Sequence, residues 1–285
     1  MNFNPINKIW FFIGSLSFVL VMLLSSCSPQ RKLAKELVDQ TPEWGVLALM
    51  PEQIFMINNR YDSNDENMEG LSEYEKNQQL LEQTLLLSKV DDTLVRRLFE
   101  TAYLSTLRSY GVLVYEESAF EDFYERDSLS WVVNIAQLEL QEFIENYEDE
   151  ENFFGMRYLQ TIPLNAVNIG VWVEISRLNG SSQKAPVYFS DQNLFDALES
   201  DFVFDFSTNS VNYYYNIDSL TPQNVYDFSG FMGRLTAAYT YDQILNNQLE
   251  QQQGISDEEP VFYRYDPYLK RLFPTEYDRF ILMEE

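Results

Sequence analysis

The sequence contains no histidine, and Cys27 is its only cysteine. These absences exclude disulfide bonds within the chain, zinc sites of the Cys or His type, haem ligation by histidine, and nucleophilic catalysis that depends on a histidine base. The ten glycines occur singly, so no glycine-rich phosphate-binding loop is present. An enzyme built from this chain would have to use carboxylates, lysine, tyrosine or serine. We therefore predict neither a cofactor nor a metal site.

Cations are also scarce, since 19 Lys and Arg residues stand against 45 Asp and Glu, for a formal net charge of −26. So acidic a chain is repelled by phosphate backbones, which argues against nucleic acid as a partner. Anionic lipid headgroups repel it too, so acyl chains rather than a basic surface would have to hold it to a membrane. Hydrophobic residues make up 45% and aromatic residues 15% of the chain, enough for a folded core.

The first 26 residues have the three-part layout of a secretory signal peptide. Lys8 supplies the positive charge, an apolar run extends from Ile9 to Leu24, and small residues precede Cys27. This run is shorter than the about 20 apolar residues that cross a bilayer core, which disfavours a permanent helical anchor. A signal anchor with an incidental cysteine is the alternative.

The residues Leu24, Ser25, Ser26 and Cys27 resemble the lipobox of bacterial lipoproteins. The resemblance implies cleavage before Cys27 and its acylation with fatty acids such as palmitate, and several acyl chains together anchor a protein durably. Ser28, in place of Asp, resembles lipoproteins sent to the outer membrane. No acidic cluster follows, unlike the pattern of surface-displayed lipoproteins. We predict a lipid-anchored protein on the periplasmic face of the outer membrane, with the bilayer as one partner.

The predicted organisation is a signal peptide over 1–26, a lipidated tether over 27–42 and a single α+β periplasmic domain over 43–285, with a subdivision near 220 as an option. Leu33, Leu37 and Val38 share one helical face in the tether. The domain begins with an apolar run over 44–50, helical periodicity over 71–110, and a second apolar run over 112–115. This order predicts a βαβ unit, in which Asp91 and Asp92 begin a helix with Leu94, Leu98 and Ala102 on its inner face.

The middle of the chain alternates apolar and polar residues as β-strands do. The alternation is clearest over 167–175, and residues 131–141 form a strand unless a helix covers 135–147. Residues 185–189 are expected to pair back on this strand, and 202–206 with 211–217 to form a hairpin. The predicted fold class is α+β, mostly antiparallel sheet, with the βαβ-like start and a long helix from the C-terminal region packed on it.

That helix begins at Thr221-Pro222 and extends to about residue 253. Gly230, Gly233 and Ala237 form a small-residue face that we expect to pack closely against the sheet or a partner. The aromatic tail over 260–285 is expected to pack along the sheet. The order of elements is loosely similar to the periplasmic domains of penicillin-binding-protein activators and related secretion lipoproteins.

Two acidic segments, 58–70 and 145–151, are predicted to be solvated loops. In the first, Asp62 and Glu73 have the spacing of a calcium-binding loop, but Asn67 occupies the position that requires glycine. Calcium binding is therefore the alternative interpretation for both segments.

Three functions fit these features. The first, which we prefer, is a non-enzymatic subunit or regulator of an envelope protein complex. The second is a glycan- or peptide-binding module, because Trp172 and Glu174 share one strand face and Tyr213 and Tyr215 share another. Tyrosines that merely cover a half-exposed sheet would give the same pattern. The third is a hydrolase using two carboxylates, Glu139 and Glu174, although no residue pair is marked as catalytic.

Overall fold

The computed structural model describes residues 29–60, 70–126, 129–178, 185–253, 261–275 and 279–283, which divide into two compact units. Unit 1 combines the residues up to Pro42 with residues 242–278, and unit 2 combines Glu43–Tyr241 with the residues from Arg279. The predicted signal peptide, lipobox and Cys27 lie outside the described residues, as does most of the segment 58–70. Within the described ranges, no helix combines the length and the apolar character needed to cross a membrane.

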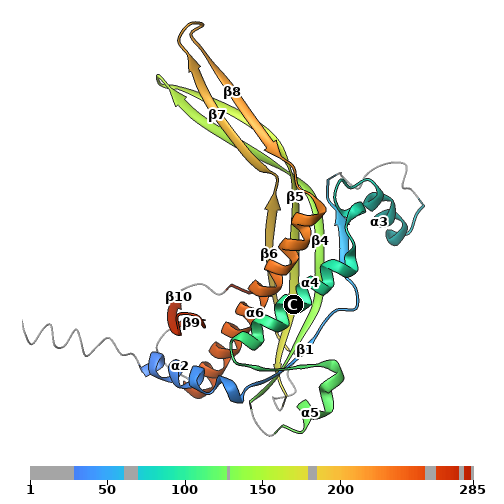
Figure 1. Cartoon of the computed structure of the whole chain (residues 1–285), viewed down its shortest axis with the longest axis vertical. Coiled ribbons are helices and arrows are strands. Elements are labelled where there is room, and N and C mark those ends of the chain that lie inside the picture. Colours follow the sequence, from blue (N-terminus) through green and yellow to red (C-terminus); the bar gives the residue numbers. More distant parts are fainter. Residues whose placement is uncertain are drawn as a thin grey trace, which may run out of the picture. The chain divides into compact units, whose positions relative to one another are not determined.

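Unit 2 is built on a mixed sheet in the order β11-β6-β5-β4-β1-β3, with β2 also paired to β4 (Figure 1). Its strands are β1 (Gly45–Leu49), β2 (Phe55–Asn58), β3 (Leu113–Glu116), β4 (Ser130–Phe153), β5 (Met156–Arg177), β6 (Val187–Phe195) and β11 (Ile281–Met283). β1 runs parallel to β3 and β4, and β2 runs parallel to β4. The α+β class is thus confirmed, but the prediction of a mostly antiparallel sheet is wrong. Alternation identifies a strand without giving its direction, and the short strands β1, β2 and β3 carry the parallel pairs.

The connection between the parallel neighbours β1 and β3 contains β2 and the helices α3 (Glu73–Glu82), η3 (Leu87–Lys89) and α4 (Asp92–Ser109). α4 begins where predicted, because the Asp91 side chain accepts a hydrogen bond of 3.1 Å from the Leu94 N–H. After α4 the chain turns through Gly111, whose φ of 91° favours glycine. Beyond β3 follow two short helices, η4 (Glu117–Ala119) and α5 (Phe120–Tyr124).

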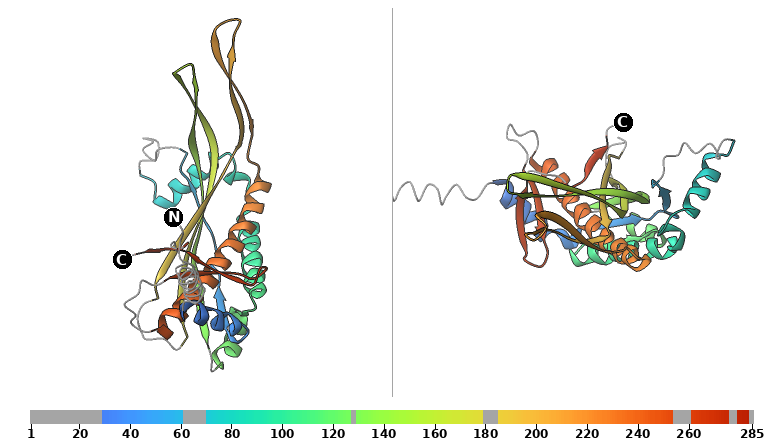
Figure 2. Two further views of the ribbon diagram at one scale, coloured as in Figure 1. Left: turned by 90° about the vertical axis from the view of Figure 1, so that its left-hand side faces the viewer. Right: turned by 90° about the horizontal axis from the view of Figure 1, so that it is seen from above.

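The buried face of α4 is rotated from the predicted one. The fully buried side chains are Val95, Phe99, Tyr103 and Leu107, whereas Leu94, Leu98 and Ala102 are only half-buried. The cause is α6 (Pro222–Gln253), whose portion up to Tyr241 lies in unit 2 and packs along α4 on the same face of the sheet (Figure 2).

α6 approaches α4 most closely at Gly233. A Cβ atom added there would lie 2.3 Å from the Phe99 carbonyl oxygen, so only glycine permits this contact. Nearby, the Ser229 hydroxyl donates a hydrogen bond of 2.7 Å to the Val95 carbonyl. The expected close packing is therefore present at Gly233, where it is made with a helix rather than with the sheet, whereas a Cβ at Gly230 would meet only the Arg234 side chain.

β4 and β5 form a hairpin with strands of 24 and 22 residues, several times the usual strand length. The helix considered over 135–147 is therefore absent, and the segment 145–151 is part of β4 rather than a loop. Its carboxylates are tolerated in a strand because they lie at the surface, where Arg157 Nη2 approaches the Glu150 carboxylate to 2.6 Å. Among the described residues, no cluster of side chains suited to a metal ion occurs.

The predicted hairpin after β6 is present as β7 (Ala197–Asp205) and β8 (Ser210–Asp218), which form a sheet of their own. The far part of the β4–β5 hairpin, residues 145–164, runs beside β7–β8 (Figure 1). We call residues 145–164 the first arm and β7–β8 the second arm. The two arms are the part of unit 2 that extends beyond its helices.

Unit 1 contains α2 (Pro29–Asp39), the part of α6 from Asp242 onward, and a hairpin of β9 (Phe262–Asp266) and β10 (Arg271–Thr275). In α2, Leu37 is buried, as expected, together with Ala34. The aromatic tail is thus divided: 262–275 forms a separate small sheet, and only β11 joins the large one. The α6 side chains Asn246 and Asp242 bind the β9 backbone at Tyr263 and Tyr265, because two helical residues four apart match two strand residues two apart.

Candidate interaction surface on two hairpin arms

A continuous set of hydrogen bonds holds the roots of the two arms together. Arg60 Nη1 donates to the Glu142 carboxylate over 3.2 Å and to the Asn165 side-chain oxygen over 2.8 Å. The Asn165 amide donates over 2.6 Å to Asp196, the single residue between β6 and β7. Asp196 also accepts from the backbone N–H of Leu220, where the chain returns from β8. The direction in which both arms leave the sheet is therefore fixed by these side chains. We call this set of hydrogen bonds, made by Arg60, Glu142, Asn165 and Asp196, the brace.

Glu142 is the most constrained member of this set. It is fully buried, and its carboxylate accepts three backbone hydrogen bonds of 2.9 to 3.0 Å from the N–H groups of residues 85–87, in addition to the Arg60 guanidinium. A carboxylate with several donors and a cation is compensated for its loss of hydration. Removing it would leave the three backbone donors without a partner and the Arg60 guanidinium without a counter-charge.

The arms contact each other through one polar group and a row of rings. The Asp149 carboxylate of the first arm accepts hydrogen bonds from the Ser200 hydroxyl over 2.6 Å and from the Tyr213 hydroxyl over 3.0 Å. Burial raises the pKa of Tyr213, and the hydrogen bond to Asp149 raises it further against a lowering by Ser200, so the phenol keeps the proton that it donates. Within the second arm, the Phe202 ring lies 4.5 Å from the Tyr213 ring, and the rings that touch between the arms lie at their ends.

The first arm ends in a two-residue turn that places an aromatic side chain in an unfavourable backbone conformation. Phe153 pairs with Met156, and the turn residues Phe154 and Gly155 have φ values of 52° and 81°. Two left-handed residues define the turn type that suits the strand twist, and glycine or asparagine usually fills it. Phenylalanine in this conformation costs about 1–2 kcal/mol. Phe154 is nevertheless 74% exposed, so burial in the free protein does not explain its presence.

A cluster of rings covers the ends of both arms. Phe154 and Phe204 have ring centroids 5.0 Å apart, and Phe204 and Phe206 have centroids 4.8 Å apart, both edge to face. Phe153 lies 6.2 Å from Phe204 and joins the two arms. Phe206 is 83% exposed. We call Phe153, Phe154, Phe204 and Phe206 the tip cluster; it is a contiguous aromatic surface with no covering element among the described residues.

Further exposed apolar side chains continue from the tip cluster along both arms: Tyr147, Met156, Leu159, Val203, Tyr214 and Tyr215. Acidic residues accompany them, including Glu148, Glu151 and Asp201. Large exposed aromatic patches that are bordered by charged residues are typical of protein interaction sites.

The structure places the four predicted ligand residues in two separate regions. Trp172 and Glu174 lie on β5 where it pairs with β6, and Tyr213 and Tyr215 lie on β8, which pairs with β7 in a separate sheet. The Tyr213 and Tyr215 rings are stacked, with centroids 6.0 Å apart. The Tyr213 hydroxyl donates to Asp149 and its ring packs against Phe202, whereas Tyr215 is exposed.

Around Trp172 the sheet carries aromatic and polar side chains on one face. The Trp172 and Phe189 rings lie 4.5 Å apart, and both overlie Gly170, where a Cβ would be only 3.2 Å from each ring. Glu139 and Asp191 flank Gly170 in the pairing register of the adjacent strands. Glu174 accepts a hydrogen bond of 2.9 Å from the Asn134 amide.

The register does not support the pair of carboxylates considered for hydrolysis. Glu139 pairs with Gly170, four residues along β5 from Glu174, which corresponds to about 13 Å between the two positions. Glycoside hydrolases place their carboxyl groups about 5–9 Å apart. Glu139 instead accepts hydrogen bonds from Gln137 and Gln141 and is nearly buried.

A second acidic region was not predicted. A cavity of about 260 Å³ opens at the ends of β1 and β3, where it is lined by Glu52, Glu100, Glu116 and Glu117 together with Arg96. Glu116 is already paired with Arg108 over 2.8 Å. The residues that line it come from three separate segments, 48–52, 96–104 and 116–118, so no sequence spacing marks the site.

One part of the tip cluster carries a local signal in the sequence. Phe153-Phe154-Gly155 follows the acidic segment 145–151 and ends in glycine, a residue typical of turns. By contrast, the partners of Glu142 are distant in sequence, and no local pattern marks them.

No protein-family model matches this sequence, and no curated protein matches it significantly.

Proposed function

We propose that this protein is a non-enzymatic, lipid-anchored subunit or regulator of an envelope protein complex and that it binds its protein partner with the tip cluster and the adjoining faces of the arms. The observation that carries the proposal is Phe154, an exposed ring held in a left-handed backbone conformation at the end of a braced arm. Strain that the free protein does not need is commonly retained for a contact made elsewhere.

The chemistry of the arms specifies the partner. Aromatic rings at the centre of a protein interface contribute most of its binding energy when they enter apolar pockets. The acidic residues beside the tip cluster favour a partner whose apolar pocket has a basic rim. The brace at Glu142 and Asp196 supports this role, because fixing the arms before binding lowers the entropy lost on association.

The lipobox resemblance supports the anchor. Acylation of Cys27 would hold the protein at the outer membrane, on its periplasmic face, and residues 1–26 would be absent from the mature chain.

The proposal is tested by mild detergent extraction of membranes that contain the tagged protein, followed by cross-linking and mass spectrometry. We expect a stoichiometric envelope protein to accompany the wild type and to be lost from the double variant Phe154→Asn/Phe206→Ser. The variant Phe120→Ser is the control, because Phe120 is an exposed ring on α5 outside the arms. Recovery of the wild-type protein alone, or equal recovery of the partner with both variants, would contradict the proposal.

A glycan-binding function is the second candidate, and the half-buried Trp172–Phe189 pair over Gly170 favours it, since accessible ring faces beside amides and carboxylates suit sugar recognition. Binding on a glycan array that Trp172→Ala abolishes and Tyr215→Ala leaves intact would support this function. Absence of binding by the wild-type protein would remove it.

A further inference from the structure

Unit 1 contains a cavity of about 700 Å³ between α2 and the β9–β10 hairpin. Four cations line it: Arg31 and Lys35 from α2, Lys270 from the turn before β10, and Arg271 from the start of β10. Asp39 is the one carboxylate among the lining residues. A chain with 45 acidic and only 19 basic residues thus gathers four cations around one cavity, which makes the local charge opposite to that of the whole protein.

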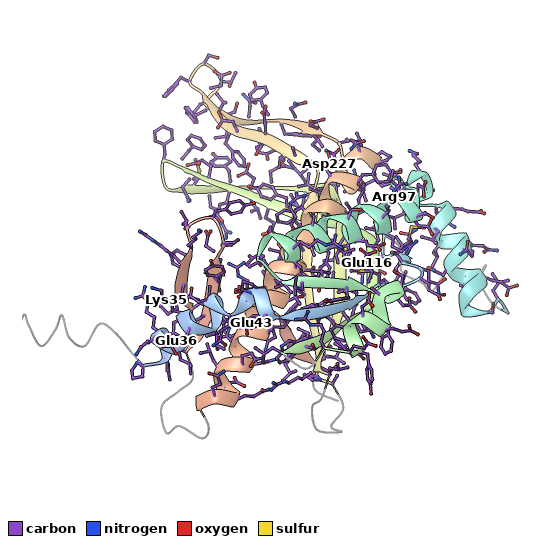
Figure 3. All side chains as sticks on the ribbon, turned by 60° about the horizontal axis from the view of Figure 1, so that its bottom comes forward. Lys35, Glu36, Glu43, Arg97, Glu116 and Asp227 are labelled. Atoms are coloured by element: carbon purple, nitrogen blue, oxygen red, sulfur yellow. The ribbon has the colours of Figure 1, made fainter. Side chains whose placement is uncertain are left out.

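Three of these cations are available to a ligand. Within the described part of the chain, no carboxylate lies at ion-pair distance from Lys35, Lys270 or Arg271. Figure 3 labels Lys35, which projects from α2 beside the hairpin. Arginine presents a planar set of donors that matches phosphate oxygens, and lysine supplies a mobile point charge.

The backbone at the turn holds two of the cations in place. The Asp266 carboxylate accepts hydrogen bonds of 2.8 Å from the N–H groups of Tyr268 and Leu269, which closes the turn. Lys270 follows in a left-handed conformation, with a φ of 49°, directly before Arg271. The position of both side chains therefore depends on a closed turn rather than on a loose segment.

Most of the remaining lining residues are apolar. Val38, Leu272 and Phe273 also line it, so a bound molecule would meet cations and an apolar wall together. At the adjoining turn, Tyr268 is 90% exposed and Leu269 is 60% exposed. An exposed aromatic and an exposed aliphatic residue beside cations are typical of segments that rest in the interfacial layer of a bilayer.

We propose that this cavity binds the phosphate group of an anionic phospholipid, with the Tyr268-Leu269 turn resting in the headgroup layer. Pro29, at the start of α2, is two residues from Cys27, which limits the chain between them to about 7 Å. The location of the cavity at a membrane surface rests on the proposed lipid anchor. The binding of a phosphate group by the cavity does not depend on that anchor. The overall negative charge then disfavours other contacts of the protein with the bilayer.

The test uses the chain from residue 27, which contains every described residue, with Cys27→Ser so that no acyl chain contributes. Its binding to phosphatidylcholine vesicles that contain phosphatidylglycerol is measured by flotation, and its binding to inorganic phosphate by calorimetry. One basic residue near an anionic surface contributes about 1 kcal/mol, so Lys35→Gln should weaken vesicle binding about fivefold and Lys270→Gln/Arg271→Gln about thirtyfold.

Lys32→Gln is the matched control, because Lys32 lies on the same helix, is exposed and does not line the cavity. We expect this variant to bind vesicles nearly as well as the parent, with an unchanged circular dichroism spectrum in every variant. Binding to inorganic phosphate alone, with the same dependence on the variants, would assign the site to a soluble phosphate compound. Equal losses for Lys32→Gln and Lys35→Gln, or no binding to either probe, would overturn the proposal. Because acylation is excluded from the assay, failure of the lipid anchor would not produce these results.

Discussion

Two glycines three residues apart on α6 should respond in opposite ways to the same substitution. A Cβ at Gly233 would lie 2.3 Å from the Phe99 carbonyl oxygen and 3.1 Å from the Ala102 Cβ. Both obstacles are rigid, so α4 and α6 must separate to admit a methyl group. A Cβ at Gly230 would meet only Arg234 Nη1, the movable end of a side chain, at 3.6 Å.

The magnitudes follow from two opposing effects. Replacing glycine with alanine inside a helix stabilises it by about 1 kcal/mol, because alanine loses less backbone entropy. Overpacking a rigid contact costs about 1–3 kcal/mol. Gly230→Ala should therefore raise the free energy of unfolding by up to about 1 kcal/mol. For Gly233→Ala the clash is with backbone, so the overpacking cost of about 2–3 kcal/mol exceeds this gain, and the free energy of unfolding should fall by about 1–2 kcal/mol.

Urea denaturation followed by circular dichroism measures both variants against the parent protein. If both substitutions stabilise the protein to the same extent, α4 and α6 do not touch at Gly233, and the packing described for unit 2 is wrong.

Three further predictions concern the arms. Phe154→Asn should change the free energy of unfolding by less than about 1 kcal/mol in urea denaturation, because relief of the left-handed strain offsets the lost contact with Phe204. The same variant should weaken partner binding at least about thirtyfold in a binding titration. Glu142→Gln should lower the free energy of unfolding by about 3–5 kcal/mol, because an amide cannot accept from Arg60 and three backbone N–H groups together; a loss below about 1 kcal/mol would contradict the brace. Hydrogen bonds from Ser207 lower the pKa of Asp205 below its ordinary 3.8, so the turn after β7 is stabilised above pH 3.8 and loosens as the pH falls through the lowered pKa. The Ser207 amide signal in NMR should therefore shift below pH 3.8, and if it does not shift, the hydrogen bond is absent.

The sequence predicted individual elements well wherever a local signal decides the structure. Alternation identified the strand at 167–175, Asp91 identified the start of α4, and Thr221-Pro222 identified the start of α6. These signals depend on neighbours in the chain, so one sequence suffices to read them.

Pairing between distant segments was the part that could not be predicted. The parallel partners of β1 and β2 depend on residues far along the chain, and so does the rotation of α4 that buries Phe99. The acidic segment 145–151 resembled a loop because charge alone does not show that Arg157 pairs across the hairpin. For the same reason the cavity in unit 1 was not predicted: its cations come from segments more than 200 residues apart, Lys35 and Lys270 among them.

The most direct test of the central claim is photo-crosslinking in intact cells from position 206, with Phe206 replaced by a photoreactive phenylalanine. The replacement keeps an aromatic ring at a site that is already 83% exposed. We predict a crosslink to one envelope protein from position 206 and none to that protein from position 120 on α5. Absence of a crosslink from position 206, or the same crosslink from position 120, would show that the arms are not the surface that binds a partner.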